Sequence, residues 1–176
     1  MHSLEIENNI CLKPMQDVDV KDLFQFIDSN RLYLRKFLNW VDSINSIEDE
    51  QNFIDSLKTD GTSLAFVILQ NNKIIGSIGF ICIDKTNKNA QIGYCIDENF
   101  QGKGIITKAC NHIIEHGFNK LNLERIEFRI AKHNFKSKAV MQRLSADYEG
   151  TLRKSLFLND SYIDCEVYSL LKNNQI

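Results

Sequence analysis

Residues 90–118 join a strand pattern directly to a helix pattern, and this junction limits the folds that the chain can adopt. The first part is apolar at every second position, the period of a strand with one buried face: Ala90, Ile92, Tyr94 and Ile96. The last part is apolar at the helical period and forms one stripe: Ile105, Ile106, Ala109, Cys110, Ile113, Ile114 and Phe118. The pattern therefore predicts a sheet strand followed at once by a helix that packs on the sheet.

The glycine-rich loop between these two elements has the properties of an anion site. Gly102 and Gly104 let the backbone come close to a ligand. At the start of the helix, the free N–H groups point outward together with the positive end of the helix dipole. The loop is therefore predicted to bind an anion, and most simply a phosphate.

Two common phosphate-binding motifs do not fit this loop. A nucleoside-triphosphate loop has Ser or Thr after its lysine and a glycine six positions before it, but Gly104 follows Lys103 and the earlier position is Asp97. A dinucleotide motif has a third glycine where this chain has Thr107, and it begins a parallel sheet where this chain shows consecutive strands. Both motifs are excluded.

The rest of the chain predicts one mixed α/β domain over residues 1–176. A first strand ends at Pro14, a later helix has a capping-box-like start at Ser46 and Asp49, and Asn134 is a good N-cap for the last helix. The expected helical segments are 17–27, 31–40, one from Ser46, one ending near Gly117 and 134–144. The expected strands are 10–15, 64–69, 74–83, 90–96, 124–130, 148–157 and 162–171.

Composition excludes several classes of function. A net charge of −2 gives no basic excess for nucleic-acid binding. No apolar run approaches the length of a membrane span, and the N-terminus lacks the pattern of a secretory signal, so we expect a cytoplasmic protein without a membrane partner. The five cysteines form no C-x-x-C pair, so we expect reduced core cysteines and no metal site.

The pattern Gln-x-x-Gly-x-x at residues 101–106 resembles the acetyl-CoA pyrophosphate loop of the GNAT acyltransferase superfamily. Residues 90–94 are similar to the family's fourth strand, and 134–140 to its second cofactor-contacting helix start. Residues 30–41 resemble the acceptor-side segment of the branch that contains ribosomal-protein serine and alanine N-acetyltransferases. The resemblance implies the GNAT α/β (α+β) fold. This is a mixed, largely antiparallel twisted sheet of six to seven strands flanked by helices, splayed between the fourth and fifth strands.

The resemblance also implies where acetyl-CoA binds. An amide near Cys95 or Ile96 is expected to face the thioester oxygen, and Ser137 matches a serine that serves as general acid toward the leaving thiolate. The pantetheine arm is expected to lie along strand 90–96, in the gap beside strand 124–130. The expected cofactor-binding residues are Cys95, Ile96, Gln101, Gly102, Lys103, Gly104, Ile105, Ile106, Thr107, Asn134 and Ser137.

The acceptor side is less well determined, because the chain departs from the family's acids there. Leu156 stands near the position of a carboxylate that activates water as the base, and Gln91 stands where many relatives carry an acid on the fourth strand. The remaining candidates for the general base are Glu98, Asp164 and Glu166. The residues expected around the acceptor are Arg31, Tyr33, Arg35, Trp40 and Gln91.

By resemblance, the expected function is transfer of an acetyl group from acetyl-CoA to a primary amine, by direct attack through a tetrahedral intermediate. A protein N-terminal α-amine, such as that of a ribosomal protein, is the first expectation. An antibiotic or polyamine acetyltransferase and a non-catalytic acyl-CoA-binding module are the alternatives. The acceptor, the acyl-chain preference and the oligomeric state, including a homo-oligomer, stay open.

Overall fold

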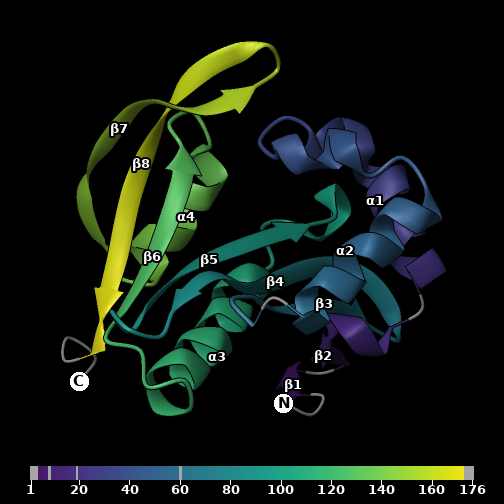
Figure 1. Cartoon of the computed structure of the whole chain (residues 1–176), viewed down its shortest axis with the longest axis horizontal. Helices are drawn as coiled ribbons and strands as arrows, with labels where there is room; N and C mark the ends of the chain where they lie inside the picture. The colour runs from purple at the N-terminus through teal and green to yellow at the C-terminus, as the bar shows by residue number, and fades with distance from the viewer. Residues whose placement is uncertain (1–3, 8, 19, 60, 173–176) are drawn as a thin grey trace.

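The computed structural model describes residues 4–7, 9–18, 20–59 and 61–172, and within these ranges eight strands form one sheet. Their order across the sheet is β1-β2-β3-β4-β5-β6-β8-β7 (Figure 1). The strands are β1 (Leu4–Glu7), β2 (Ile10–Pro14), β3 (Leu64–Gln70), β4 (Lys73–Asp84), β5 (Asn89–Ile96), β6 (Arg125–Ala131), β7 (Asp147–Leu158) and β8 (Ser161–Leu171).

All neighbouring strands are antiparallel except β5 and β6, which are parallel and pair over three residues of β5, from Asn89 to Gln91. Beyond Gln91 the two strands diverge, as Figure 1 shows. They are the expected fourth and fifth strands, so the predicted mixed sheet and its splay are confirmed. The additional strand, β1, has only four residues, too few for a clear alternating pattern.

Helices cover both faces of the sheet. Ile75 faces the core that contains α3 and α4, whereas the next residue toward the N-terminus, Ile74, faces the core under α1 and α2. This alternation follows from the two-residue period of strand β4. The helices are α1 (Val20–Leu34), α2 (Ile47–Thr59), α3 (Ile105–Asn119) and α4 (Phe135–Arg143), with short 3₁₀ turns η1 (Met15–Asp17), η2 (Asn39–Ser43) and η3 (Glu98–Phe100).

The expected helix ends agree with the structure at α2 and α4 but not around α1. The Asp49 amide donates to Ser46 Oγ at 3.1 Å, and the Ser137 amide donates to Asn134 Oδ1 at 3.2 Å, so both predicted caps are confirmed. The two helical segments expected at 17–27 and 31–40 are wrong. A single helix α1 spans Val20–Leu34, and a separate 3₁₀ turn follows from Asn39.

The β7–β8 hairpin crosses from the C-terminal half of the sheet to the loop after α1. Its tip turns at Asn159 and Asp160, both at positive φ, a backbone region that Asn and Asp tolerate better than most residues. Asn159 Nδ2 donates to the Arg35 carbonyl at 3.5 Å, and Asn39 Nδ2 donates to the Phe157 carbonyl at 3.3 Å. The hairpin therefore contacts the N-terminal half at a second point beside the diverging strands (Figure 1).

No helix in the described part of the chain combines the length and the apolar character needed to cross a membrane. All five cysteines are free thiols, and Cys95, Cys110 and Cys165 are buried.

Candidate functional site

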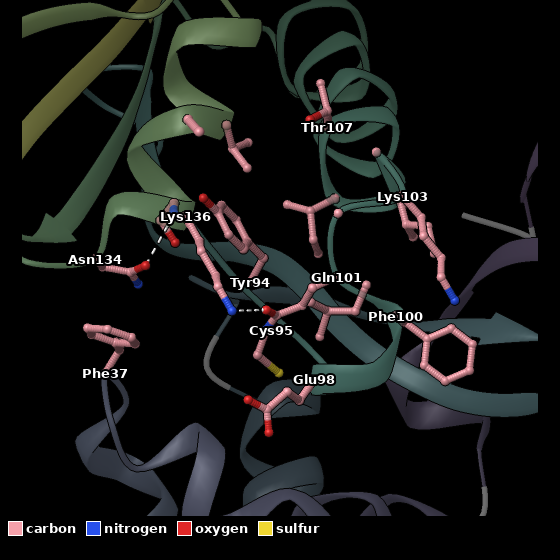
Figure 2. A pocket seen from close by; sticks show the side chains of 18 of the residues that line it. Phe37, Tyr94, Cys95, Glu98, Phe100, Gln101, Lys103, Thr107, Asn134 and Lys136 are labelled. Atoms are coloured by element: carbon pink, nitrogen blue, oxygen red, sulfur yellow. Dashed lines mark hydrogen bonds between the residues drawn. The ribbon is translucent and has the colours of Figure 1, made fainter.

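A cavity of about 870 Å³ lies where β5 and β6 diverge. Its walls are the end of β5 with η3, the loop 101–104, the first turns of α3 and α4, and the end of α1 with the residues that follow it (Figure 2). Every residue expected on the donor side lines this cavity, including Ser137, Asn134 and the loop from Gln101 to Thr107. Segments more than 100 residues apart in the chain therefore meet at one site.

The loop before α3 presents free amide groups to the cavity. Gly104, the N-cap of α3, has φ +76°, and a Cβ there would meet no atom within 4 Å. The first intrahelical bond of α3 runs from the Lys108 amide to the Gly104 carbonyl at 3.1 Å, which leaves the preceding amides without a helical partner. Thr107 Oγ1 is also buried without a partner in the described structure. With no acid in the first turn, this helix start fits a phosphate.

The free edge of β5 supplies further amides. The Asp97 amide donates to the Ile75 carbonyl at 2.8 Å on the β4 side. Because amides in an antiparallel ladder alternate in direction, the Cys95 amide also faces β4, whereas the Tyr94 and Ile96 amides face the gap beside β6. Of the two residues expected near the thioester oxygen, Ile96 therefore directs its amide into the gap.

Ser137 lies in the first turn of α4, with its side chain beside Tyr94. The Tyr94 hydroxyl is buried near the Ser137 side chain without reaching hydrogen-bond geometry. Burial raises the pKa of Tyr94, while the Ser137 hydroxyl lowers it by a smaller amount, so the phenol keeps its proton at neutral pH. Two protonated hydroxyls thus line the same wall of the cavity.

Gln101 connects the two halves of the molecule across the cavity. Its Nε2 donates to the Tyr33 hydroxyl of α1, and its Oε1 accepts from Lys136 Nζ of α4. Figure 2 shows the Lys136 side chain reaching from α4 to Gln101. The Lys136 ammonium also lies 5.7 Å from the centre of the Tyr33 ring. Tyr33 is the one residue expected on the acceptor side that lines the cavity.

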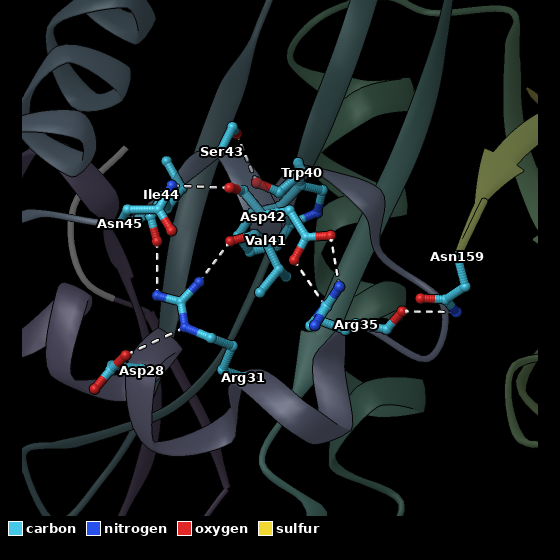
Figure 3. A network of polar contacts seen from close by, with 10 residues as sticks. All are labelled: Asp28, Arg31, Arg35, Trp40, Val41, Asp42, Ser43, Ile44, Asn45 and Asn159. Carbon is cyan, nitrogen blue, oxygen red and sulfur yellow. Dashed lines mark hydrogen bonds and ion pairs between the residues drawn. The ribbon is translucent and has the colours of Figure 1, made fainter.

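The other residues expected around the acceptor lie outside the cavity lining. Arg31 donates to the Val41 carbonyl at 2.8 Å and to the Ile44 carbonyl at 2.6 Å, so its guanidinium holds η2 against α1 (Figure 3). Arg35 pairs with Asp42 at 2.7 Å. Trp40 is 39% exposed on η2, and Gln91 pairs with Ile81 and Glu127 within the sheet.

The three candidate bases differ in their surroundings. Asp164 accepts from the Lys154 amide at 3.0 Å and Lys132 Nζ at 3.2 Å, and these bonds hold its pKa below the usual value. Although burial acts to raise the pKa of Glu166, its hydrogen bonds lower the pKa overall. The donors to Glu166 are Lys138 Nζ and the Tyr168 hydroxyl, each at 2.7 Å. Of the three, only Glu98 lines the cavity.

Sequence reasoning missed part of the lining. The alternating pattern places Tyr94 on the buried face of a strand and does not mark it as a site residue. Its hydroxyl is the signal that could have identified it, because a buried tyrosine hydroxyl needs a polar partner. Lys136 and Arg143, on α4, bring positive charge to the cavity, while Leu34 and Phe37 add apolar side chains to its lining. Among the described residues, no three His, Cys, Asp or Glu side chains gather as a metal site requires.

Known proteins with similar sequences and structures share this architecture. The family model described as Acetyltransferase (GNAT) domain matches residues 9–146. The ribosomal-protein-serine acetyltransferase of Escherichia coli (strain K12) is 32% identical, covering 98% of both chains. A ribosomal L7/L12 α-N-protein acetyltransferase in complex with coenzyme A has a TM-score of 0.89 at 26% identity, covering 97% of this chain and 98% of the other. The microcin C7 self-immunity acetyltransferase, in complex with acetyl-CoA and AMP, has a TM-score of 0.85 at 30% identity, covering 94% of each chain.

Proposed function

This chain belongs to the GNAT acetyltransferase family, and we propose that it transfers the acetyl group of acetyl-CoA to the N-terminal α-amine of a protein, with a ribosomal protein as the first candidate. The observation that carries the proposal is the cavity itself, because it brings the free amides before α3, the open edge of β5 and Ser137 onto one surface. Such a surface matches the three parts of the donor: pyrophosphate, pantetheine and thioester.

We assign the pyrophosphate to the loop from Gln101 to Thr107. The amides of its last residues have no partner within the helix, and the dipole of α3 favours negative charge there. Lys103, Lys136 and Arg143 line the same cavity and add positive charge. Lys136, which is bound to Gln101 in this structure, can exchange that bond for a phosphate oxygen when the donor binds.

We assign the pantetheine arm to the gap between β5 and β6. The amide groups of the pantetheine arm then hydrogen-bond to the edge of β5 that β6 leaves unpaired, as an added strand does. The Ile96 amide then faces the thioester oxygen and stabilises the negative charge of the tetrahedral intermediate. Removing one such donor in other enzymes raises the barrier by about 3 kcal/mol.

The chemistry needs a neutral amine and an acid for the leaving thiolate. The amine nitrogen attacks the thioester carbon, the C–S bond breaks as the intermediate collapses, and the nitrogen loses its extra proton to water, so that the products are an amide and coenzyme A. We propose that the Ser137 hydroxyl donates a hydrogen bond or proton to the departing sulfur, because Ser137 lies on the cavity wall beside the protonated Tyr94. A thiolate with a pKa of roughly 8.5 needs only this modest assistance.

The charge of the cavity favours a single amine over a polyamine. Its lining contains three basic residues, Lys103, Lys136 and Arg143, and within the described part of the chain Glu98 is its one acidic residue. A polyamine carries several ammonium groups and needs more than one carboxylate, whereas a peptide N-terminus carries one ammonium at its reacting end.

We also keep the expectation that the enzyme acts in the cytoplasm.

A small-molecule amine is the second candidate. Its support is the similarity to the microcin C7 self-immunity acetyltransferase, whose structure contains acetyl-CoA and AMP.

A panel of acceptors tests the proposal. We expect release of coenzyme A with a peptide that begins with a free Ser or Ala. The values of kcat/KM should be at least about tenfold lower for the same peptide with a blocked N-terminus and an internal lysine, for spermidine, and for an aminoacyl nucleotide. Mass spectrometry of the product locates the acetyl group. Faster turnover of a small amine than of every peptide would contradict the α-amine assignment and support the second candidate.

A further inference from the structure

Glu98 is the acidic side chain that the structure leaves available to an acceptor. Asp164 holds the Lys154 amide in the bulged part of β7, and Glu166 is bound by Lys138 and Tyr168. Glu98 lines the cavity, and its backbone carbonyl accepts from the Gln101 amide at 3.5 Å, whereas its carboxylate makes no hydrogen bond or ion pair with a described residue. Its carboxylate is therefore free to bind a ligand, unlike the other two acids.

The backbone of Glu98 is fixed in place by its neighbours. It begins the turn η3 directly after β5, and Asp97 caps that turn by accepting from the Asn99 amide at 2.8 Å. Asn30 of α1 donates to the other oxygen of Asp97 at 3.5 Å. The position of Glu98 is thus tied both to β5, which directs the Ile96 amide into the gap, and to α1.

Apolar side chains share the cavity lining with Glu98. They include Leu34, Phe37 and Leu38, from the end of α1 and the residues after it. In Figure 2, Glu98 lies below Cys95 on the side of Phe37, and Thr107 lies at the opposite end of the view. Glu98 itself is exposed to solvent, so its carboxylate attracts an ammonium group through an interaction that salt screens.

We propose that Glu98 is the subsite that binds the ammonium group of the acceptor and positions its nitrogen toward the thioester before the proton is lost. The inference rests on the proposed function, since it names the residue that recognises the amine. Glu98 thereby separates the two substrates by charge, because the phosphates of the donor go to the free amides before α3 and to the basic side chains of the lining. Apolar contact with Phe37 and Leu38 then favours an acceptor with an uncharged group next to its amine.

The test compares Glu98→Gln with the wild type, using a free-N-terminus peptide and acetyl-CoA. We expect the KM for the peptide to rise about tenfold and to lose most of its dependence on salt, because the variant keeps the shape and removes the charge. The Kd of acetyl-CoA, measured by calorimetry, should stay within about twofold. Glu98→Asp, which keeps the charge on a shorter arm, should give an intermediate KM.

Glu115→Gln is the matched control, because it removes the same charge from the exposed face of α3. It should leave the peptide KM and its salt dependence unchanged. Equal peptide KM values for wild type and Glu98→Gln would overturn the assignment of Glu98, and so would a loss of acetyl-CoA affinity as large as the rise in peptide KM. Either result would leave the proposed function standing. A wild-type enzyme that acetylates no amine at all would instead contradict the proposed function.

Discussion

Burial controls the charge of Glu50, in the first turn of α2. Its side chain is 1% exposed, and its Oε2 has no hydrogen-bond partner in the described structure. Loss of hydration raises the pKa of this carboxyl from 4.5 to about 7. An ionised carboxylate without partners is costly in such a place, so Glu50 takes up a proton in the folded state at mildly acidic pH.

This shift predicts a pH-dependent stability. Between about pH 4.5 and 7 the folded state holds a proton on Glu50 that the unfolded state has lost, so the free energy of unfolding falls as the pH rises through this window. Glu50→Gln removes the effect. Urea unfolding should show the variant to be more stable than the wild type at pH 8, by up to about 3 kcal/mol, with little difference at pH 4.5.

Glu48→Gln, on the same turn but exposed, is the control for Glu50 and should show no such pH dependence. A stability difference between Glu50→Gln and wild type that is the same at pH 4.5 and pH 8 would refute the buried-carboxyl account.

Single residues were predictable where a local pattern defines them, and less so where distant backbone does. The N-caps Ser46 and Asn134 follow from local chemistry, and the structure has both. The role of Arg31 depends on carbonyls of Val41 and Ile44, whose positions are set only when the 3₁₀ turn η2 folds back on α1. A sequence pattern contains no signal for such a contact.

At the scale of elements, the glycine-rich loop and α3 act as one anion-binding unit. Gly104→Glu tests this unit, because it places a side chain and a negative charge where no protein atom lies within 4 Å. We expect acetyl-CoA affinity to fall by at least about tenfold in calorimetry, through repulsion of the phosphates and loss of space. Positive φ at this position adds a stability cost of about 1 to 2 kcal/mol.

Gly150→Glu is the matched control for Gly104→Glu. Gly150 also has positive φ and open space around its Cβ, but it lies on β7, outside the cavity lining. The control should lose stability and keep its affinity. An unchanged Kd in Gly104→Glu would show that the loop does not hold the donor.

Elements with a long periodic pattern were predicted well, and short ones were not. The strand β5 and the helix α3 each repeat their apolar period several times, and both occur as expected. The strand β1 and the turn η2 have four and five residues, so neither period can be read from them. Their existence depends on pairing with β2 and on packing against α1.

At the scale of the whole molecule, the function depends on two half-sheets joined by a short parallel contact. The order of elements and the resemblance to the family predicted this splayed sheet. They did not predict that Tyr33, Gln101 and Lys136 meet across the opening, because these residues come from three elements that only the folded chain brings together. The donor side could thus be predicted from a continuous motif, whereas the acceptor side is assembled from separate segments.

The central claim is that acetyl-CoA binds in the gap between β5 and β6. A crystal structure of the complex tests it most directly. We predict that the pyrophosphate contacts the amides of residues 102–107, that the thioester oxygen lies about 3 Å from the Ile96 amide, and that the sulfur lies within reach of Ser137 Oγ. A donor bound outside this gap, or a thioester directed away from Ile96 and Ser137, would contradict the account.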